Sequence, residues 1–312
     1  MTTIILLAAL TAAQSPAPTL ESQVRALIAK SGAEVAVAYR TLDGKSELLI
    51  DPDKSFHAAS TMKVPVMIEL FRQVEAGTIK LDDPLPIRND FRSIVDGSPY
   101  KLSEGDDSDR EVYANVGKTM TLRALNEVMI AVSSNFATNL LIEKLGVENV
   151  RATVTRLGAD GMKVLRGVED TKAFEKGLNN ATTARALLVL FEVIGQGQAV
   201  SAAADKAMLE VLKRQKFNDG IPAGVPAGTP VAHKTGSITR IHHDAGIVFG
   251  PSPYVLVILV RGIQDQKVSG PLMAAISKAV WESQIPVASF QFSAPSWSLV
   301  AANWQLATGQ NT

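Results

Sequence analysis

Strand-forming segments lie near both ends of this 312-residue chain, and helical patterns fill the part between them. Residues 34–40 (EVAVAYR) and 46–50 (SELLI) are apolar segments joined by an Asp-Gly turn, which predicts a hairpin. Three further strand-like segments follow near the C-terminus: residues 229–238, 242–250 and 254–262. We therefore expect an α/β fold with one antiparallel sheet built from both termini, flanked by helices, and an all-helical subdomain inserted into it.

Apolar residues at helical spacing predict the helices of this fold. Three helices are expected in the first half of the chain: residues 20–30, a helix that follows the opening of the 56–67 stretch and ends at about Ala76, and residues 122–145, which Gly146 can cap. Three more are expected after it: one from Thr182 or Thr183 to about Gly195, and two at residues 202–214 and 271–281. A polar region at 82–109, rich in Gly, Pro and Asp, has no such pattern. We predict that the chain is divided into two subdomains. Residues 20–55 and 215–283 form the α/β sheet subdomain, and residues 56–214 form the helical subdomain.

The composition limits the classes of partner. The 31 basic and 31 acidic residues balance, so the chain has no net charge to attract nucleic acid or an anionic membrane surface. The absence of cysteine excludes disulfides, a thiolate nucleophile and cysteine-based zinc sites. We expect a small-molecule ligand, no nucleic acid, no membrane span and a monomer.

The two ends of the chain carry separate signals. An apolar run from Ile4 to Leu10, followed by small residues, predicts a signal peptide at residues 1–13 and a periplasmic or secreted protein. Because no positive charge precedes the run, a misassigned start is the alternative. Residues 284–312 form an uncharged extension in which Trp297, Val300, Ala301 and Trp304 have helical spacing, so the extension either packs on the body or a partner or is disordered.

One lysine lies in an otherwise apolar stretch, FHAASTMKVPVM at residues 56–67. Residues three apart share a helix face, so Ser60 and Lys63 can meet there. An apolar setting lowers the pKa of a lysine, which produces a base able to deprotonate a serine hydroxyl. The alternative is that Ser60 only caps the helix and Lys63 extends to water. A second S-x-x-K, Ser98 to Lys101, lies in the polar region where no helix aligns the pair.

Two further motifs follow in order. Ser133 to Asn135 (SSN) interrupts the periodicity of residues 122–145, which predicts a loop between two helices. Lys234 to Gly236 (KTG) lies in a predicted strand that turns at Ser237, and glycine there permits the close backbone approach of an extended, carboxylate-bearing ligand. A helix cap for the first motif and an exposed edge-strand lysine for the second are the alternatives.

The ordered set S-x-x-K, S-x-N and K-T-G resembles the class A serine β-lactamases and the related penicillin-binding DD-peptidases. The resemblance runs from about Leu20 to Trp281 and includes FHAASTMKVPV, TLRALNEVMIAVSSNFATNLLIEKLG, NNATTARALLVL and VAHKTGS. It implies a β-lactamase/transpeptidase-like fold and a β-lactam or peptidoglycan-like substrate. It also implies a serine hydrolase that needs no metal or other cofactor.

The resemblance implies a role for each matching residue. Ser60 would attack the amide carbonyl, Lys63 would take or relay its proton, and Ser133 would protonate the departing nitrogen. The expected substrate-binding residues are Asn135 for a side-chain amide, Lys234 and Thr235 for a carboxylate, Gly236 for close approach, and Ser237, whose N–H would form an oxyanion hole with that of Ser60.

Hydrolysis of the acyl-enzyme needs a carboxylate that activates water, and the loop VLRGVEDTKAFEKGLNN offers three. Glu169 has the family's spacing from Ser133 and follows an arginine-containing start. Glu175 fits the family's E-x-x-L-N pattern, and Asp170 is a further candidate. The alternative is an ordinary solvated acidic loop.

At three positions this sequence differs from the class A pattern, and these differences weaken the prediction of a β-lactamase relative to related proteins of the superfamily. Ser134 and His233 stand where class A enzymes carry aspartate, and Arg240 is the nearest match for an arginine that helps to bind the substrate carboxylate. A DD-peptidase, an esterase or a penicillin sensor that acylates and stops are therefore the alternatives. A phosphate loop at Gly117 to Thr119 is disfavoured because Val112 replaces its first glycine, and joint metal binding by His242 and His243 is disfavoured because neighbours in a strand face opposite ways.

Overall fold

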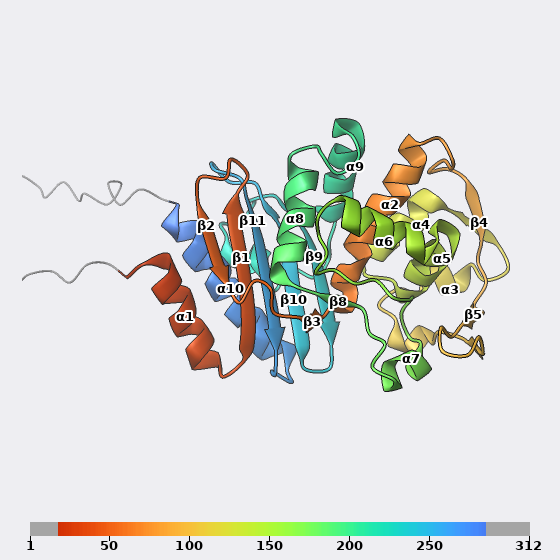
Figure 1. The fold of residues 1–312 in the computed structure, drawn as a ribbon, viewed down its shortest axis with the longest axis horizontal. Helices are drawn as coiled ribbons and strands as arrows, with labels where there is room; N and C mark the ends of the chain where they lie inside the picture. Colours follow the sequence, from red (N-terminus) through yellow and green to blue (C-terminus); the bar gives the residue numbers. More distant parts are fainter. Residues whose placement is uncertain (1–17, 285–312) are drawn as a thin grey trace, which may run out of the picture.

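A five-stranded antiparallel sheet joins the two ends of the chain in the computed structural model, which describes residues 18–284 (Figure 1). Its order is β2-β1-β11-β10-β9. The strands are β1 (Glu34–Thr41), β2 (Glu47–Ile50), β9 (Val231–Ile238), β10 (Ile241–Val248) and β11 (Tyr254–Arg261). Strand β1 pairs with β11, and Val37 lies opposite Ile258. The expected fold class, a sheet built from both terminal parts with helices around it, is confirmed.

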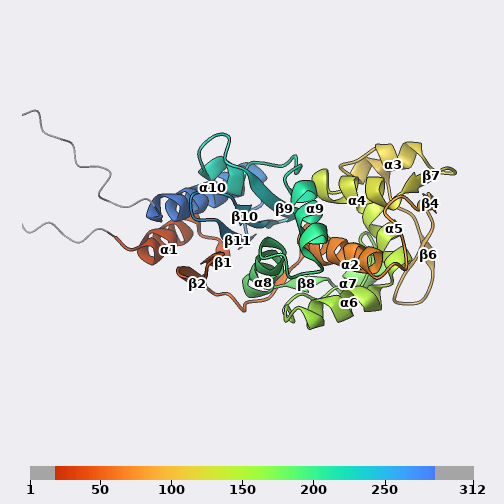
Figure 2. The same cartoon turned by 90° about the horizontal axis from the view of Figure 1, so that it is seen from above.

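Helices cover both faces of this sheet. Helix α8 (Ala184–Gly195) lies on one face, and α1 (Leu20–Ser31) and α10 (Gln266–Ser283) lie on the other (Figure 2). Alternate side chains of β11 point to opposite faces of the sheet. Val255, Val257 and Leu259 belong to the core that includes α8. Leu256, Ile258 and Val260 belong to the core that includes residues of α1 and α10. Burial on both faces explains why this strand is a continuous apolar run.

Side-chain caps fix most of the predicted helix starts. Thr19 accepts the N–H of Ser22 at α1, and Thr183 accepts the N–H of Ala186 at α8. The start of the last helix was predicted too late. Asp265 caps α10 ahead of Gln266, whereas the apolar pattern predicts a start at Pro271, which lies inside the helix.

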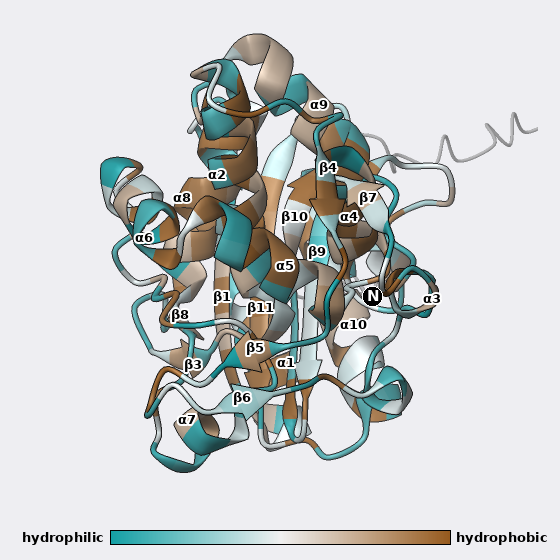
Figure 3. Cartoon of the chain, turned by 90° about the vertical axis from the view of Figure 1, so that its right-hand side faces the viewer, coloured by the Kyte–Doolittle hydropathy of each residue, from teal (hydrophilic) through white to brown (hydrophobic). Residues whose placement is uncertain are grey.

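The other half of the molecule is mainly helical. It contains α2 (Lys63–Glu75), α4 (Leu122–Ala131), α5 (Asn135–Leu145), α6 (Val147–Arg156) and α9 (Ala202–Leu212). Helix α2 runs through the middle and contacts the other four. The segment 122–145 divides at Val132–Ser134, as the SSN motif predicted. Figure 3 shows the apolar residues of these helices and of the sheet in brown and the more hydrophilic loops around α7 in teal.

Short elements connect these layers and surround the cleft. They are β3 (Phe56–His57), the 3₁₀ turn η1 (Ala59–Met62), β4 (Pro84–Pro86), β5 (Phe91–Arg92), β6 (Pro99–Tyr100), η2 (Glu104–Asp106), α3 (Glu111–Ala114), β7 (Thr119–Thr121), α7 (Thr171–Glu175), β8 (Ala181–Thr182) and η3 (Ile221–Gly224). The predicted signal peptide and almost all of the C-terminal extension lie outside the described residues. Within residues 18–284, no helix has both the length and the apolar character that crossing a bilayer requires.

The close contact between β9 and β10 yields a stability prediction. A Cβ added at Gly246 would lie 2.4 Å from the Cβ of His233 and 2.5 Å from the carbonyl oxygen of Ala232. Gly246→Ala should therefore lower the free energy of unfolding by about 1–3 kcal/mol, the usual cost of overpacking, as measured by denaturant titration. Gly270→Ala is the matched control, because its nearest neighbour would be 3.4 Å away and alanine suits helix α10. Equal stability of the two variants would contradict this account of the strand contact.

Candidate active site

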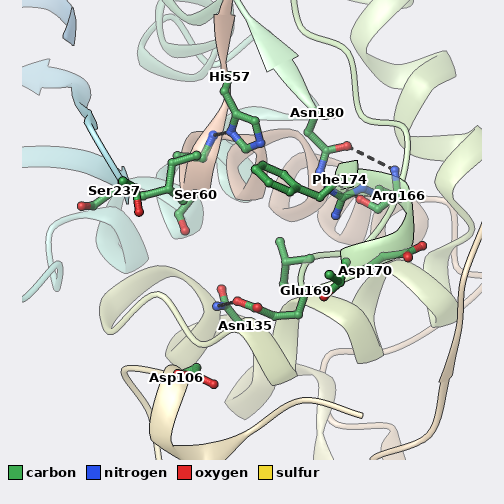
Figure 4. A pocket seen from close by; sticks show the side chains of 15 residues that line it. His57, Ser60, Asp106, Asn135, Arg166, Glu169, Asp170, Phe174, Asn180 and Ser237 are labelled. Carbon is green, nitrogen blue, oxygen red and sulfur yellow. Dashed lines mark hydrogen bonds between the residues drawn. The ribbon is translucent and has the colours of Figure 1, made fainter. Parts of the chain in front are cut away.

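Ser60 lies at the junction of the sheet and the helical half, on the wall of a cavity of about 480 Å³ (Figure 4). It belongs to the 3₁₀ turn η1, and the α-helix proper begins only at Lys63. Our expectation that both residues share one α-helix was therefore wrong in detail. The preceding residue, Ala59, has a φ of 45°, a left-handed conformation that is unfavourable for alanine.

Lys63 is completely buried and turns toward the loop between α4 and α5. Its Nζ donates to the carbonyl oxygen of Ser133 (2.6 Å), to Oδ1 of Asn135 (2.8 Å) and to Oγ of Ser133 (3.2 Å). Burial lowers the pKa of Lys63 to about 7, against the opposing charges of Asp107 and Glu169. The burial and the lowered pKa that the apolar stretch predicts for Lys63 are therefore present, and its role as the base stays a prediction.

The Oγ of Ser133 lies between two lysines. Lys63 approaches it from α2, and Lys234 Nζ donates to it at 3.0 Å from strand β9. Ser133 itself has a φ of 63°, whereas Ser134 caps α5 by accepting the N–H of Ala137. The loop therefore directs Ser133 into the site and uses the second serine, at the family's aspartate position, to start the next helix.

Asp107 supports this loop and was missed by the sequence analysis. Its carboxylate accepts the N–H of Asn135 (3.0 Å) and the N–H of Phe136 (2.9 Å), so a negative charge lies at the N-terminus of α5. The surrounding EGDDSD segment indicated only a polar loop, because sequence alone does not show which of its carboxylates faces the helix.

Lys234 lies on the edge strand β9, as expected, but its side chain is completely buried. Burial, and then the charge of Lys63, hold its pKa well below the usual value for lysine, while Asp244 acts in the opposite direction. Gly236 lies against Ser60: a Cβ at this position would be 3.0 Å from the backbone nitrogen of that serine. Thr235 is half-buried beside it, and Ser237 lines the cavity.

Glu169 faces Ser60 across the cavity and accepts a hydrogen bond from Nδ2 of Asn135 at 2.9 Å (Figure 4). Its side chain stays accessible to solvent, but loss of hydration and then the charges of Asp106 and Asp107 raise its pKa, and Lys63 partly offsets this. Among the loop carboxylates, Glu169 combines access to the cavity with an environment that strengthens it as a base.

Asn139 of α5 fixes the loop just before Glu169. Its Oδ1 accepts the N–H of Val168 (2.6 Å), and its Nδ2 donates to the carbonyl oxygen of the same residue (3.0 Å). This approach requires Gly167, since a Cβ there would lie 2.4 Å from Oδ1 of Asn139. Neither residue was singled out from the sequence.

The other two loop carboxylates have different surroundings. Asp170 is buried, accepts hydrogen bonds from Ser93 Oγ and Ile94 N, and caps α7, so it ties two loops together. Glu175 is exposed at the end of α7 and is not among the residues that line the cavity. The family-like spacing, which favoured Glu169, therefore agrees with the geometry better than the E-x-x-L-N pattern does.

The secondary candidates lie away from the cavity. Ser98 is bonded to Asp96 and Lys172 in the β5–β6 hairpin, so the second S-x-x-K forms no buried pair. Arg240 donates to the carbonyl oxygen of Gly262 and is not among the cavity-lining residues. His233 forms a buried pair with Asp244 at 2.8 Å, which connects β9 to β10.

The comparisons with known proteins agree with this geometry. Residues 19–284 match the model of the β-lactamase enzyme family. The chain belongs to the β-lactamase enzyme family. The resemblance to class A serine β-lactamases that the motifs indicated is thereby confirmed, together with the serine hydrolase class.

Relatives match over most of their lengths. A β-lactamase of Citrobacter koseri is 27% identical over 270 residues, which cover 84% of this chain and 87% of that protein. β-Lactamase CTX-M-97 of Escherichia coli is 27% identical over 288 residues, covering 90% and 94%. Among solved structures, PBP-A has a TM-score of 0.74 at 25% identity, covering 85% of this chain and 95% of that one.

The state of Lys63 predicts how acylation depends on pH. A lysine with a pKa of about 7 is a neutral base above that pH and a protonated non-base below it. The rate of acyl-enzyme formation should therefore rise with pH through about 7 and then level off. Lys63→Arg, which keeps the charge but supplies no neutral base, should lose about 10² to 10⁴ in this rate. Stopped-flow measurements with a chromogenic cephalosporin test both points, and a rate independent of pH across this range would exclude Lys63 as the base.

Proposed function

We propose that this β-lactamase family member opens the β-lactam amide through a covalent acyl-enzyme on Ser60 and then hydrolyses that ester. The observation that carries the proposal is the approach of two buried lysines to Ser133, beside a serine on the cavity wall. A PBP-A mutant whose structure is an acyl-enzyme complex with penicillin G, 25% identical to this chain with a TM-score of 0.74, supports it.

In the acylation step, neutral Lys63 takes the proton of the Ser60 hydroxyl while Oγ attacks the lactam carbonyl carbon. The ring C–N bond then breaks, and Ser133 gives its proton to the departing nitrogen. Lys63 returns a proton to Ser133, whose Oγ lies 3.2 Å from Nζ. Protons balance over the step, and Lys63 ends as the neutral base with which it began.

Substrate binding uses the edge strand and the loop after α4. Lys234 and Thr235 hold the substrate carboxylate, and Gly236 lets the ligand approach β9. Asn135 binds the side-chain amide. The N–H groups of Ser60 and Ser237 stabilise the developing oxyanion, for which one donor typically contributes about 10² to 10³ in rate.

In the deacylation step, Glu169 removes a proton from a water molecule that attacks the ester carbonyl, and Ser60 leaves as the alcohol. A raised pKa makes Glu169 a stronger base than an ordinary surface carboxylate. The acyl-enzyme complex of the PBP-A mutant with penicillin G favours one alternative for this chain, a binding protein that acylates and does not go on to hydrolyse the ester. How efficiently Glu169 activates water decides whether the acyl-enzyme is hydrolysed, as in a β-lactamase, or persists, as in a penicillin-binding protein.

The remaining assignments belong to this proposal. We infer that residues 1–13 direct export, that the mature protein acts as a monomer in the periplasm or outside the cell, and that the sheet and helical subdomains meet at the active site.

Removal of the Ser60 hydroxyl tests the assignment of the nucleophile. Ser60→Ala should abolish the covalent adduct with penicillin, measured by intact-protein mass spectrometry. Ser98→Ala is the matched control and should be labelled like the wild type, since Ser98 is held by Asp96 and Lys172 in a surface hairpin. Undiminished labelling of Ser60→Ala would refute the assignment of the nucleophile.

Neutralising the loop carboxylates tests deacylation. Glu169→Gln should acylate at a near-normal rate but accumulate as the acyl-enzyme, because general-base help worth about 10² to 10⁴ is lost. Glu175→Gln should turn over normally, since Glu175 lies outside the cavity lining. Mass spectrometry during turnover distinguishes the species. Trapping by Glu175→Gln alone, or by neither variant, would overturn the role of Glu169.

A further inference from the structure

We propose that His57 is a positioning residue that acts on the nucleophile through Ala59, and that it does so only when its imidazole is neutral. The inference rests on the proposed role of Ser60. It adds a residue that the motifs do not contain, and it predicts a second ionisation in the acylation step.

The backbone just before Ser60 is in an unfavourable conformation. Ala59 is buried and has a φ of 45°. A non-glycine residue persists in the left-handed region only when its surroundings hold it there. The backbone N–H of Ala59 donates to Nδ1 of His57 at 3.0 Å, so this imidazole is one of the groups that holds the residue.

The hydrogen bonds specify the tautomers of two histidines. Nδ1 of His243 accepts the N–H of Val260 (3.2 Å), so the proton of its neutral ring is on Nε2, which donates to the carbonyl oxygen of His57 (2.9 Å). Burial lowers the pKa of His243 to about 4, so that ring is neutral at physiological pH. His57 likewise uses Nδ1 as an acceptor, which places its proton on Nε2.

The surroundings of His57 favour its neutral form. The residue lies on the cavity wall, and its strand β3 pairs with β8 through Ala181 (Figure 4). Arg166 lines the same cavity from the loop before α7, and His243 reaches His57 from β10 through the hydrogen bond to its carbonyl oxygen. Burial, and then the charge of Arg166, lower the pKa of His57, whereas Asn179 acts in the opposite direction.

Protonation of His57 removes the support from Ala59. An imidazolium carries a proton on both nitrogens, so Nδ1 would become a donor that faces the donating N–H of Ala59. The hydrogen bond becomes a repulsive contact, and Ala59 can relax toward the right-handed region. Because Ser60 is the next residue, its Oγ and its backbone N–H move with that change.

Three substitutions at one position separate this role from a merely structural one. In asparagine, Oδ1 is as many bonds from the main chain as Nδ1 is in histidine, so His57→Asn can accept the same N–H, as Asx turns do. His57→Ala has no acceptor, and the acceptor of His57→Gln is one bond too far away. We expect His57→Ala and His57→Gln to lose about tenfold in acylation rate, the equivalent of the conformational cost at one such residue. His57→Asn should keep the rate near pH 8.

The pH profile gives the decisive readout. In the wild type, the logarithm of the acylation rate should fall with a slope of one below the pKa of Lys63. It should fall more steeply over the range in which His57 also protonates, because loss of the support costs a further factor of about ten. His57→Asn should keep a slope of one throughout. The control is His242→Asn, since His242 faces Ser269 on the other side of the sheet, and this variant should retain the steep wild-type limb.

Nitrogen NMR tests the tautomer without any substrate. The spectrum should show an unprotonated Nδ1 and a protonated Nε2 on His57 at neutral pH. A proton on Nδ1, or a limb steeper than one that persists in His57→Asn, would overturn the inference. If instead the wild type forms no adduct with penicillin while the tautomer is as expected, the proposed function fails and the backbone support of Ala59 stands.

Discussion

Two buried lysines that converge on one serine hydroxyl constrain the whole active site. Lys63 and Lys234 are both fully excluded from solvent, and both donate to Oγ of Ser133. Two buried ammonium groups that contact the same hydroxyl repel each other strongly, so the arrangement favours a neutral form for one of the two lysines. The helical half supplies Lys63 and Ser133, whereas the sheet supplies Lys234. The packing of the two halves therefore sets the chemistry of the site.

Residues with unfavourable backbone conformations lie in the proposed active site. Ala59, Ser133 and Glu169 all have positive φ values, and each is, or directly precedes, a proposed catalytic residue. Such conformations cost about 1–3 kcal/mol each and persist where the surroundings fix them. His57 holds Ala59, and Asn139 holds the peptide before Glu169. The loops of the site are thus attached to rigid helices and strands.

Periodicity and motif order predicted much of this architecture. The strands near both ends, the break at the SSN motif and the buried lysine of the S-x-x-K motif follow from patterns that side-chain burial imposes. The start of α10 was missed because a capping aspartate outweighed Pro271 as a signal. Asp107, Asn139 and His57 were missed because they bind backbone groups of residues that the fold alone brings to them. No spacing in the sequence marks such contacts.

The central claim is that this family member forms and then hydrolyses an acyl-enzyme on Ser60. The most direct test is intact-protein mass spectrometry over time after penicillin is added to the wild-type protein, with peptide mapping of the adduct. We predict a transient adduct of one penicillin mass on Ser60, followed by free enzyme and hydrolysed penicillin. A lasting adduct, an adduct on another residue, or product formation without any adduct would contradict the account.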